Sequence, residues 1–435
     1  MQIFQKDQLS NKKTKADLLD VLILLWIFSS ALLKLVLYFF DIQSNSGQLA
    51  IIYIIVAVAS AFLCFKHFSR MITTGFLKIV LLFVFVGISF IFSSVRYGTN
   101  EDKFVSEFKS YFAMVICTIL LTLLILWKKK KDINLNFVFI ASIVLTLISF
   151  LPLFRGDSLT TGGYISDSSG LIYQNISYYA AYAFGLTLFH ITETRKIKPL
   201  SWFYIIVCFI LLVIQSSTCL LSGGRGGVVL LVVLFVASIF NNIGKRAYKF
   251  VIPVAIFLFI VRFTVPNLIN MLNINIMGLD RILKFLNGNI FSDGRTNLYI
   301  NSFELFREDP IIGKGIGSIF HLLHSYSHNM FLDILTETGI LGLLVFLYIF
   351  INYFIKNYSL FRQGSLFRFL TVIFLCGLTL NMFSGYVWTN PFIWLPIAVV
   401  ITVRKNEFEP DISESIEVEN DNHDDLSSLE GEIDG

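Results

Sequence analysis

Charge is scarce in this sequence. Only 15% of its 435 residues are charged, whereas soluble domains carry about 25%. Hydrophobic residues make up 55% of the chain, including 45 phenylalanines, and the mean hydropathy is +0.73. Apolar runs of about 20 residues recur, which is the length that a helix needs to cross the ~30 Å hydrocarbon layer of a bilayer. The composition excludes a soluble domain and predicts an all-α integral membrane protein.

Paired cysteines are also lacking. The five cysteines lie at positions 64, 117, 208, 219 and 376, and four of them fall inside apolar runs. Their spacing matches neither a disulfide framework nor a metal site, so they are expected to be small buried hydrophobes. The polar N-terminal segment 1–18 is followed by no small-residue cleavage site. The first apolar run is therefore expected to be a retained helix that follows a cytoplasmic segment, and not a signal peptide.

Twelve apolar runs predict about twelve transmembrane helices, nine within residues 19–265 and three within 335–403. The expected spans are residues 19–40, 47–65, 75–93, 108–127, 136–153, 174–192, 200–216, 227–241, 249–265, 335–355, 366–383 and 388–403. Lysine and arginine alternate between the connecting segments, with 21 on one side and 4 in the short loops of the other. The positive-inside rule makes the richer side cytoplasmic, so both termini of this multi-pass protein are expected there.

Two segments lie outside the expected bundle. Residues 266–327 form one outside loop of 62 residues, and loops of that length are usually functional. Together with the residues up to 334 (266–334), they are expected to form a large periplasmic or extracellular catalytic loop that contains short helices. Residues 404–435 are acidic and poor in apolar side chains, which predicts a disordered cytoplasmic tail.

An internal repeat is another missing feature. Secondary transporters are often built from duplicated halves and place polar groups at the bilayer midplane. No repeat of fixed period is visible in this chain, and charges inside the apolar runs are few, with Lys34 the deepest. A transporter is therefore disfavoured, although it stays the alternative from another functional class.

The first polar cluster is Ser222-Gly223-Gly224-Arg225-Gly226-Gly227, in an outside turn. Its glycines, Gly224 and Gly226 among them, allow positive φ and close approach of a ligand, and successive N–H groups can form an anion-binding nest. Arg225 adds a planar fork suited to phosphate oxygens. A phosphate-binding P-loop is excluded, because no Gly-Lys-Ser/Thr follows. The alternative is a tight interhelical turn with an interfacial arginine.

The long loop contains a second cluster, Ser292-Asp293-Gly294-Arg295, followed by an amphipathic helix expected over 296–309 and ended by Pro310. A cation in the first helical turn opposes the helix dipole. The arrangement makes sense if Arg295 and the helix N-terminus share an anionic ligand, and the alternative is a solvated surface arginine. The glycine-rich turn at 310–317 lacks dinucleotide-binding spacing and is expected to shape the site.

Three of the six histidines, His321, His324 and His328, lie within eight residues. No familiar ligand spacing links them to a carboxylate, so a metal site is not expected. A single histidine as general base fits better, because its ordinary pKa near 6.5 suits proton abstraction at neutral pH. Asn329 is a candidate to hold substrate hydroxyls. Glu337 either orients a neighbour or makes a structural hydrogen bond.

The order of these outside-facing features resembles the O-antigen ligase and O-antigen polymerase superfamily, whose members are multispan proteins with a large outside loop between late helices. That loop runs from an arginine at the head of a helix through a Pro-x-x-Gly-x-Gly-like turn to His-Asn and Glu-x-Gly. Here these are Arg295, Pro310 with Gly313 and Gly315, His328-Asn329, and Glu337-Thr338-Gly339. Arg225 in its glycine turn and, more loosely, Gln174-Asn175 complete a similarity that is strong over residues 220–345.

The resemblance implies a GT-C-like, inverting, metal-independent membrane glycosyltransferase without a cofactor. Its donor would be a glycan on polyprenyl (undecaprenyl) diphosphate, used on the outer side of the bacterial cytoplasmic (inner) membrane. The expected catalytic residues are His328 as general base, with Arg225 and Arg295 on the diphosphate. The expected substrate-binding residues are Gln174, Asn175, Gly224, Gly226, Asn329, Glu337 and His324.

Within this family, polymerisation of the repeat units of a surface polysaccharide, either O-antigen or capsule, is the favoured function. The alternative is a ligase that transfers the glycan to the lipid A core of lipopolysaccharide, or to protein. From another class, a transporter of the lipid-linked glycan stays open. Membrane lipids and other polysaccharide-assembly proteins are expected partners, and nucleic acid is not.

Overall fold

Helices make up almost all of the structure. In the computed structural model, the chain is described over residues 17–40, 46–64, 73–98, 102–154, 173–243 and 295–403. Within these ranges there is no strand, which agrees with the predicted all-α fold. The helices are α2 (Leu18–Phe40), α3 (Ser46–Cys64), α4 (Thr74–Tyr97), α5 (Asp102–Trp127), α6 (Leu135–Phe150), α7 (Tyr173–Ile197), α8 (Trp202–Leu221), α9 (Arg225–Ile243), α12 (Arg295–Glu308), α13 (Ser318–Leu323), α14 (Met330–Leu360), α15 (Ser365–Phe383) and α16 (Pro391–Thr402), with the short 3-10 helices η2 (Leu151–Phe154) and η6 (Val387–Thr389).

Eleven of the twelve expected spans coincide with one of these helices, and the span expected at 249–265 lies outside the described residues. In the described ranges, five helices are long and apolar enough to cross a membrane: α4, α5, α8, α14 and α15. The segment expected to form the large loop includes two short helices, α12 and α13. Residues 1–16 of the predicted N-terminal segment, the first part of the expected loop up to residue 294 and the acidic tail from residue 404 lie outside the described residues.

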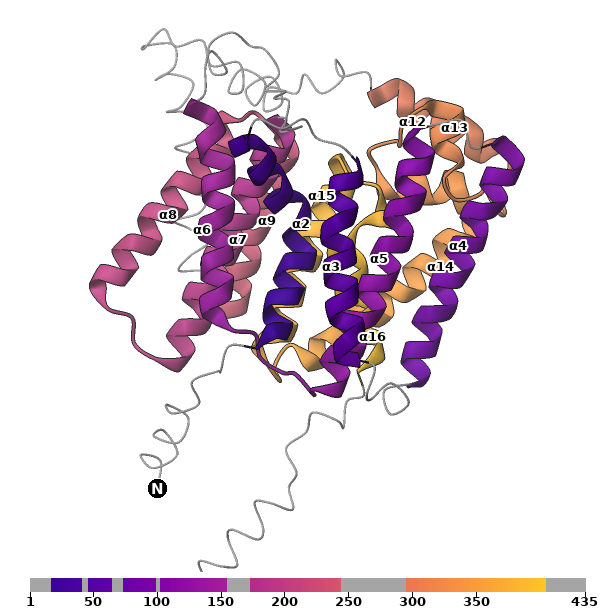
Figure 1. Ribbon diagram of the computed structural model, residues 1–435. Helices are drawn as coiled ribbons and strands as arrows, with labels where there is room; N and C mark the ends of the chain where they lie inside the picture. Colours follow the sequence, from indigo (N-terminus) through magenta and orange to yellow (C-terminus); the bar gives the residue numbers. More distant parts are fainter. Residues whose placement is uncertain are drawn as a thin grey trace, which may run out of the picture.

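Helix α7 contains many polar residues, yet most of its side chains are buried. It packs against α6, α8 and α9 on one side of the bundle (Figure 1). Small residues such as Ala180, Ala183 and Gly185 allow this close packing, as is usual between helices in a membrane. A Cβ atom on Gly185 would lie 2.7 Å from Leu234 of α9.

α15 joins this group of helices to the rest of the bundle. It contacts α7 and α9 on one side, and α14 and α16 on the other. α16 in turn packs against α4 and α5, and α5 packs against α3. The end of α15 at Phe383 therefore lies where both groups of helices meet, and α12 and α13 cover the same end of the bundle as the first turn of α14 (Figure 1).

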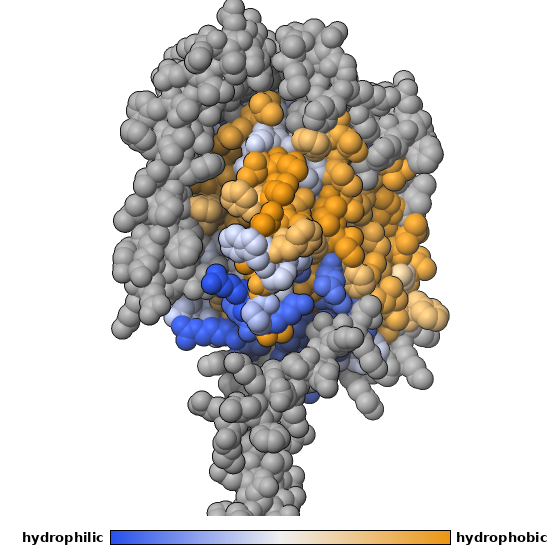
Figure 2. Space-filling view, turned by 90° about the vertical axis from the view of Figure 1, so that its left-hand side faces the viewer, coloured by the Kyte–Doolittle hydropathy of each residue, from blue (hydrophilic) through white to orange (hydrophobic). Residues whose placement is uncertain are grey.

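Apolar and polar residues occupy separate regions of the surface. On the face shown in Figure 2, hydrophilic residues gather in a band at one end, next to an extended hydrophobic surface. Many large apolar side chains are exposed on the outer helices, for example Phe62, Phe85 and Trp202. In water, such exposed apolar side chains would promote aggregation, whereas in a membrane they are covered by lipid. All five cysteines are buried and free, as expected for small buried hydrophobes.

Candidate active site

A break in α14 organises the end of the bundle that carries the polar loop residues. Gly339 has φ +64 inside this helix, so the helical hydrogen-bond ladder is interrupted there. The turn that begins at Pro310 supplies the missing partners. The N–H of Gly315 donates to the Glu337 carbonyl at 2.8 Å, and the N–H of Ile340 donates to the Pro310 carbonyl at 2.9 Å. The Pro-x-x-Gly-x-Gly turn and the Glu-x-Gly segment are therefore two halves of one backbone joint.

Glycine is required at this joint for two reasons. Gly313 and Gly339 both have positive φ, at 71° and 64°, which L side chains rarely adopt. A Cβ atom on Gly313 would lie 2.4 Å from the carbonyl carbon of Glu337, and one on Gly339 would lie 2.3 Å from the carbonyl oxygen of Ile311. The turn shapes the site, as expected, by packing its backbone directly on the backbone of α14.

The Glu337 side chain ties this joint to the loop between α15 and α16. Its carboxylate is fully buried and accepts hydrogen bonds from the Gly317 N–H (2.8 Å), the Tyr386 hydroxyl (2.8 Å) and the Trp388 indole N–H (2.7 Å). The geometry is that of the structural hydrogen bond considered for this residue. A direct contact between Glu337 and substrate stays a prediction that would require these bonds to open.

His328 lies immediately before α14, in a backbone conformation fixed by its neighbours. Its φ is +63, in the left-handed region that is uncommon for a residue other than glycine. On one side, the N–H of Ser327 donates to the buried Asp333 carboxylate at 2.7 Å. On the other, Asn329 caps α14 through its side-chain oxygen, which accepts the N–H groups of Phe331 and Leu332. Asn329 therefore has a structural role as the N-cap of α14. Its contact with substrate hydroxyls stays a prediction.

The His328 ring packs against the end of α15. It lies edge-on to the Tyr326 ring, with 4.5 Å between the ring centroids, and the Phe383 carbonyl accepts a hydrogen bond from it. Tyr326 in turn donates its hydroxyl to the Ser384 carbonyl at 2.6 Å. Residues Phe383 and Ser384 therefore anchor both aromatic side chains of this loop.

The glycine turn before α9 meets the same residues from the opposite side. Arg225 is the first residue of α9. A Cβ atom on Gly226 would lie 1.9 Å from the Tyr178 hydroxyl and 3.0 Å from Phe383. Tyr178 donates its hydroxyl to Ser384 at 3.4 Å. Phe383 and Ser384 thus lie between the turn that carries Arg225 and the loop that carries His328, although these two elements are far apart in the sequence.

Gly224 is constrained in the same way by α7. The Ser177 hydroxyl donates to the Gly224 carbonyl at 2.8 Å, and a Cβ atom on Gly224 would lie 2.4 Å from the Ser177 Cβ and 3.4 Å from the Gln174 Cα. The sequence predicted that these glycines let a ligand approach closely, whereas the element that approaches Gly224 here is α7. Contact of Gly224 and Gly226 with substrate stays a prediction. The approach of α7 also brings Gln174 and the adjacent Asn175 beside the Arg225 turn.

Comparison with known proteins finds a family that resembles the part of the chain with the polar loop residues. Residues 209–347 match the family model described as O-antigen ligase. This stretch, about a third of the chain, is therefore similar to the O-antigen ligase family. No curated protein and no solved structure matches the chain. The matched segment includes Arg225, Arg295, His328 and Glu337, but neither Phe383 nor the start of α7.

Arg295, which lies within the matched segment, acts electrostatically on His328 and its neighbours. The pKa of His328 is lowered to about 4, first by burial and then by the positive charge of Arg295, while the hydrogen bond to Phe383 opposes the change. Arg295 is the first residue of α12. Its positive charge also interacts electrostatically with Tyr326 and Tyr178. The expectation of an ordinary pKa near 6.5 for His328 is therefore wrong, because burial and a neighbouring cation both disfavour the imidazolium.

The other two histidines of the loop point elsewhere. His321 packs its ring against Phe104, with 4.4 Å between the centroids. His324 is exposed at the end of α13, and its carbonyl accepts a hydrogen bond from Lys103 at 2.7 Å. Across the ranges that the structure describes, no group of three histidine, cysteine, aspartate or glutamate residues is placed to hold a metal ion.

The structure adds residues that sequence reasoning missed. Tyr178, Tyr326 and Ser384 line the junction between the Arg225 turn and His328, and Asp333 fixes the loop at Ser327. Of these, only Asp333 carried a usable sequence signal, because a carboxylate in the first turn of an apolar helix needs a hydrogen-bond donor when buried.

Proposed function

We propose that this protein is a membrane glycosyltransferase that polymerises oligosaccharide repeat units carried on polyprenyl diphosphate. The main support is the convergence of the Arg225 turn, Arg295 and His328 around Phe383 and Ser384. Two arginines and one partly buried histidine suit a reaction with a dianionic leaving group and a hydroxyl nucleophile. The similarity of residues 209–347 to the O-antigen ligase family supports the same substrate class.

The proposed step is an inverting displacement that needs no metal. The acceptor hydroxyl oxygen attacks the anomeric carbon while the bond between that carbon and the diphosphate oxygen breaks. His328 takes the hydroxyl proton, and the electron pair of the broken bond leaves on the polyprenyl diphosphate. Arg225 and Arg295 stabilise that charge, which is the usual source of catalysis when a phosphate group departs. Glu337 and Asp333 act as positioning residues for the loop that carries His328.

The low pKa of His328 fits this order of events. The free imidazole is neutral at pH 7 and able to accept a proton, but burial and the positive charge of Arg295 make it a weak base. A bound diphosphate would neutralise Arg295 and remove one of the two causes that lower the pKa. The base then gains strength only when the donor is in place, which favours transfer over premature protonation.

A ligase reaction uses the same donor and the same leaving group. It differs only in the acceptor, which would be a lipid A core or a protein hydroxyl in place of a second lipid-linked unit. The favoured polymerase function therefore depends on the acceptor side of the site, and product analysis separates the two.

Reconstitution in liposomes tests the proposal. The full-length protein receives polyprenyl-diphosphate oligosaccharide as sole substrate, and the glycans are then sized. A ladder of longer lipid-linked glycans is the expected result. Transfer only after addition of a lipid A core or protein acceptor would make the protein a ligase, and movement of the intact donor across the bilayer without a new glycosidic bond would support the transporter.

A further inference from the structure

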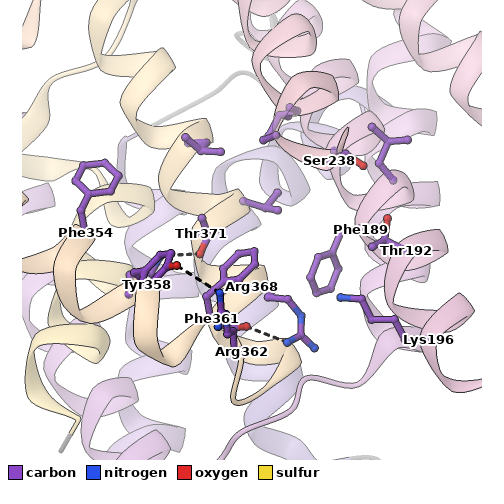
Figure 3. A pocket seen from close by; sticks show the side chains of 17 residues that line it. Phe189, Thr192, Lys196, Ser238, Phe354, Tyr358, Phe361, Arg362, Arg368 and Thr371 are labelled. Carbon is purple, nitrogen blue, oxygen red and sulfur yellow. Dashed lines mark hydrogen bonds between the residues drawn. The ribbon is translucent and has the colours of Figure 1, made fainter. Parts of the chain in front are cut away.

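A cleft of about 730 Å³ lies far from the candidate active site, between the α7 and α9 pair and the α14 and α15 pair (Figure 3). Residues about one helical turn apart, on one face of each helix, line this cleft. Thr192 and Lys196 come from α7, Phe354 and Tyr358 from α14, and Arg368 from α15. Its residues lie toward the ends of these helices that are opposite Arg225 and His328, so the cleft belongs to the other end of the bundle.

The cleft is divided along its length into an apolar and a basic part. Leu188, Leu234 and Leu375 line the deep part, where Gly185 lets α7 approach α9 closely. Lys196, Arg362 and Arg368 line the other end (Figure 3). Gly185 and Lys196 are separated along α7 by about 16 Å, which is close to the depth of one leaflet of a bilayer whose hydrocarbon core is ~30 Å thick.

The basic end is held in place by a buried ion pair. Arg368 binds the Glu193 carboxylate through two nitrogens, at 2.8 and 2.7 Å, and donates a third hydrogen bond to the Phe361 carbonyl at 2.9 Å. Lys196 also reaches Glu193, at 2.7 Å, but its side chain is 42% exposed. Arg362 donates a hydrogen bond to the neighbouring Tyr358 hydroxyl, at 3.3 Å. Among the described residues, Lys196, Arg362 and Arg368 together with Glu193 form a group with two positive charges in excess.

These features select one kind of occupant. An acyl chain fits the apolar part, and the excess positive charge at leaflet depth complements an anionic headgroup. The basic residues belong to segments that the positive-inside rule assigns to the cytoplasm, and the cytoplasmic leaflet is the one whose anionic lipids attract such residues. We infer that this cleft binds a glycerophospholipid with an anionic headgroup, with Lys196 and Arg362 on the phosphate and one acyl chain between α9 and α14.

The inferred lipid would connect the elements that carry the candidate active site. α9 begins at Arg225, α14 follows His328 directly, and α15 ends at Phe383. A lipid between these helices at one end sets their spacing at the other. The binding itself does not depend on the proposed function, so its test uses no activity measurement.

Native mass spectrometry of the delipidated full-length protein provides that test, with phosphatidylglycerol and phosphatidylcholine of identical acyl chains as probes. Each cation near an anionic lipid is worth about five-fold in affinity, so the wild type should prefer phosphatidylglycerol by about 25-fold. The Lys196→Gln/Arg362→Gln variant should lose this preference. Lys129→Gln, an exposed lysine at the same end but outside the cleft, is the matched control and should keep it. Glu193 and Arg368 are left unchanged, since breaking a buried ion pair destabilises the fold.

A second variant separates the cleft from general surface charge. Ala237→Trp fills the cleft from α9 while all cations remain, and it should weaken both lipids. Equal affinity of the wild type for the two lipids, or full phosphatidylglycerol binding by Ala237→Trp, would overturn the inference. Preferential displacement of phosphatidylglycerol by undecaprenyl phosphate would also overturn it, because the occupant would then be the glycan carrier.

Discussion

His328 is the residue on which the proposed chemistry depends most. Its backbone is held by the Asp333 and Asn329 hydrogen bonds, and its ring is held by Tyr326 and the Phe383 carbonyl. A residue with positive φ and this many restraints has little freedom to move. The arrangement suits a base that must meet an acceptor hydroxyl in one fixed position.

Replacing His328 should remove the transfer step and leave the fold intact. We expect His328→Ala to lower the transfer rate by about 10²- to 10⁴-fold, the usual worth of a general base, while binding of the lipid-linked donor persists. His324→Ala is the control, because His324 is exposed and lies outside the junction. Glycan ladders and donor binding would be measured in liposomes, and a near-normal ladder from His328→Ala would remove the base role.

Arginine at position 225 should not be replaceable by lysine. An ammonium group keeps the charge but loses the bidentate fork that matches phosphate oxygens. We expect Arg225→Lys to raise the KM for the donor by about ten-fold or more, the range of a lost charge-assisted hydrogen bond. Arg96→Lys, an exposed arginine that lies 4.0 Å from Asp309 near α12, should leave the KM unchanged. Wild-type donor affinity in Arg225→Lys would argue against diphosphate binding at this position.

The low pKa of His328 sets the pH dependence of the reaction. Below its pKa the imidazole is protonated and has no free electron pair to accept a proton. The kcat/KM for the donor reports the free enzyme, in which no diphosphate neutralises Arg295. It should therefore stay level as the pH falls from ordinary values and drop only near a pH of about 4. Arg295→Gln removes a positive charge, which raises the pKa of His328 and moves this drop to higher pH. A wild-type drop near the ordinary pKa of about 6.5 would contradict the assignment.

Among the elements, the joint between α14 and the turn at 310–317 determines where His328 lies. The break at Gly339 frees backbone groups that the turn then satisfies, and Glu337 connects the joint to Tyr386 and Trp388. A buried carboxylate with three donors is stable only as a complete set, since each donor left alone would cost free energy.

A matched pair of glycines tests this joint. Gly339 and Gly98 share a backbone region that is essentially restricted to glycine, with φ/ψ of +64/−165 and +88/−177. Alanine at either position costs about 1–3 kcal/mol of strain. A Cβ atom on Gly98 meets nothing within 4 Å, whereas one on Gly339 lies 2.3 Å from the Ile311 oxygen. Gly339→Ala should therefore unfold at a clearly lower temperature in detergent and transfer less glycan than Gly98→Ala, and equal losses would show that the joint contributes nothing beyond strain.

Hydropathy predicted the positions of the helices because burial in lipid depends on short stretches of sequence. Helices α4 and α15 each begin one residue before the expected span. Helix α5 begins six residues earlier than expected, with the polar turn at Asp102. The break in α14 was not predicted, because a glycine inside an apolar run does not reveal that another segment will complete its hydrogen bonds.

Over the whole molecule, the site arises from segments that are distant in sequence. Motif spacing singled out Arg225, Arg295 and His328, whereas Tyr178 and the Phe383–Ser384 pair carry no local pattern and gain their place only when α7, α9 and α15 pack together. The burial of Glu337 has the same origin, because two of its three partners, Tyr386 and Trp388, lie beyond α15. The low pKa of His328 likewise depends on a cation 33 positions away in the chain.

The most direct measurement counts the polyprenyl diphosphate released for each glycosidic bond formed, in liposomes that contain the purified protein and the lipid-linked oligosaccharide alone. We expect one diphosphate carrier released per new bond, a growing ladder of lipid-linked glycan, and loss of both in the His328→Ala variant. Bond formation without carrier release, or carrier release that His328→Ala leaves unchanged, would contradict the proposed function.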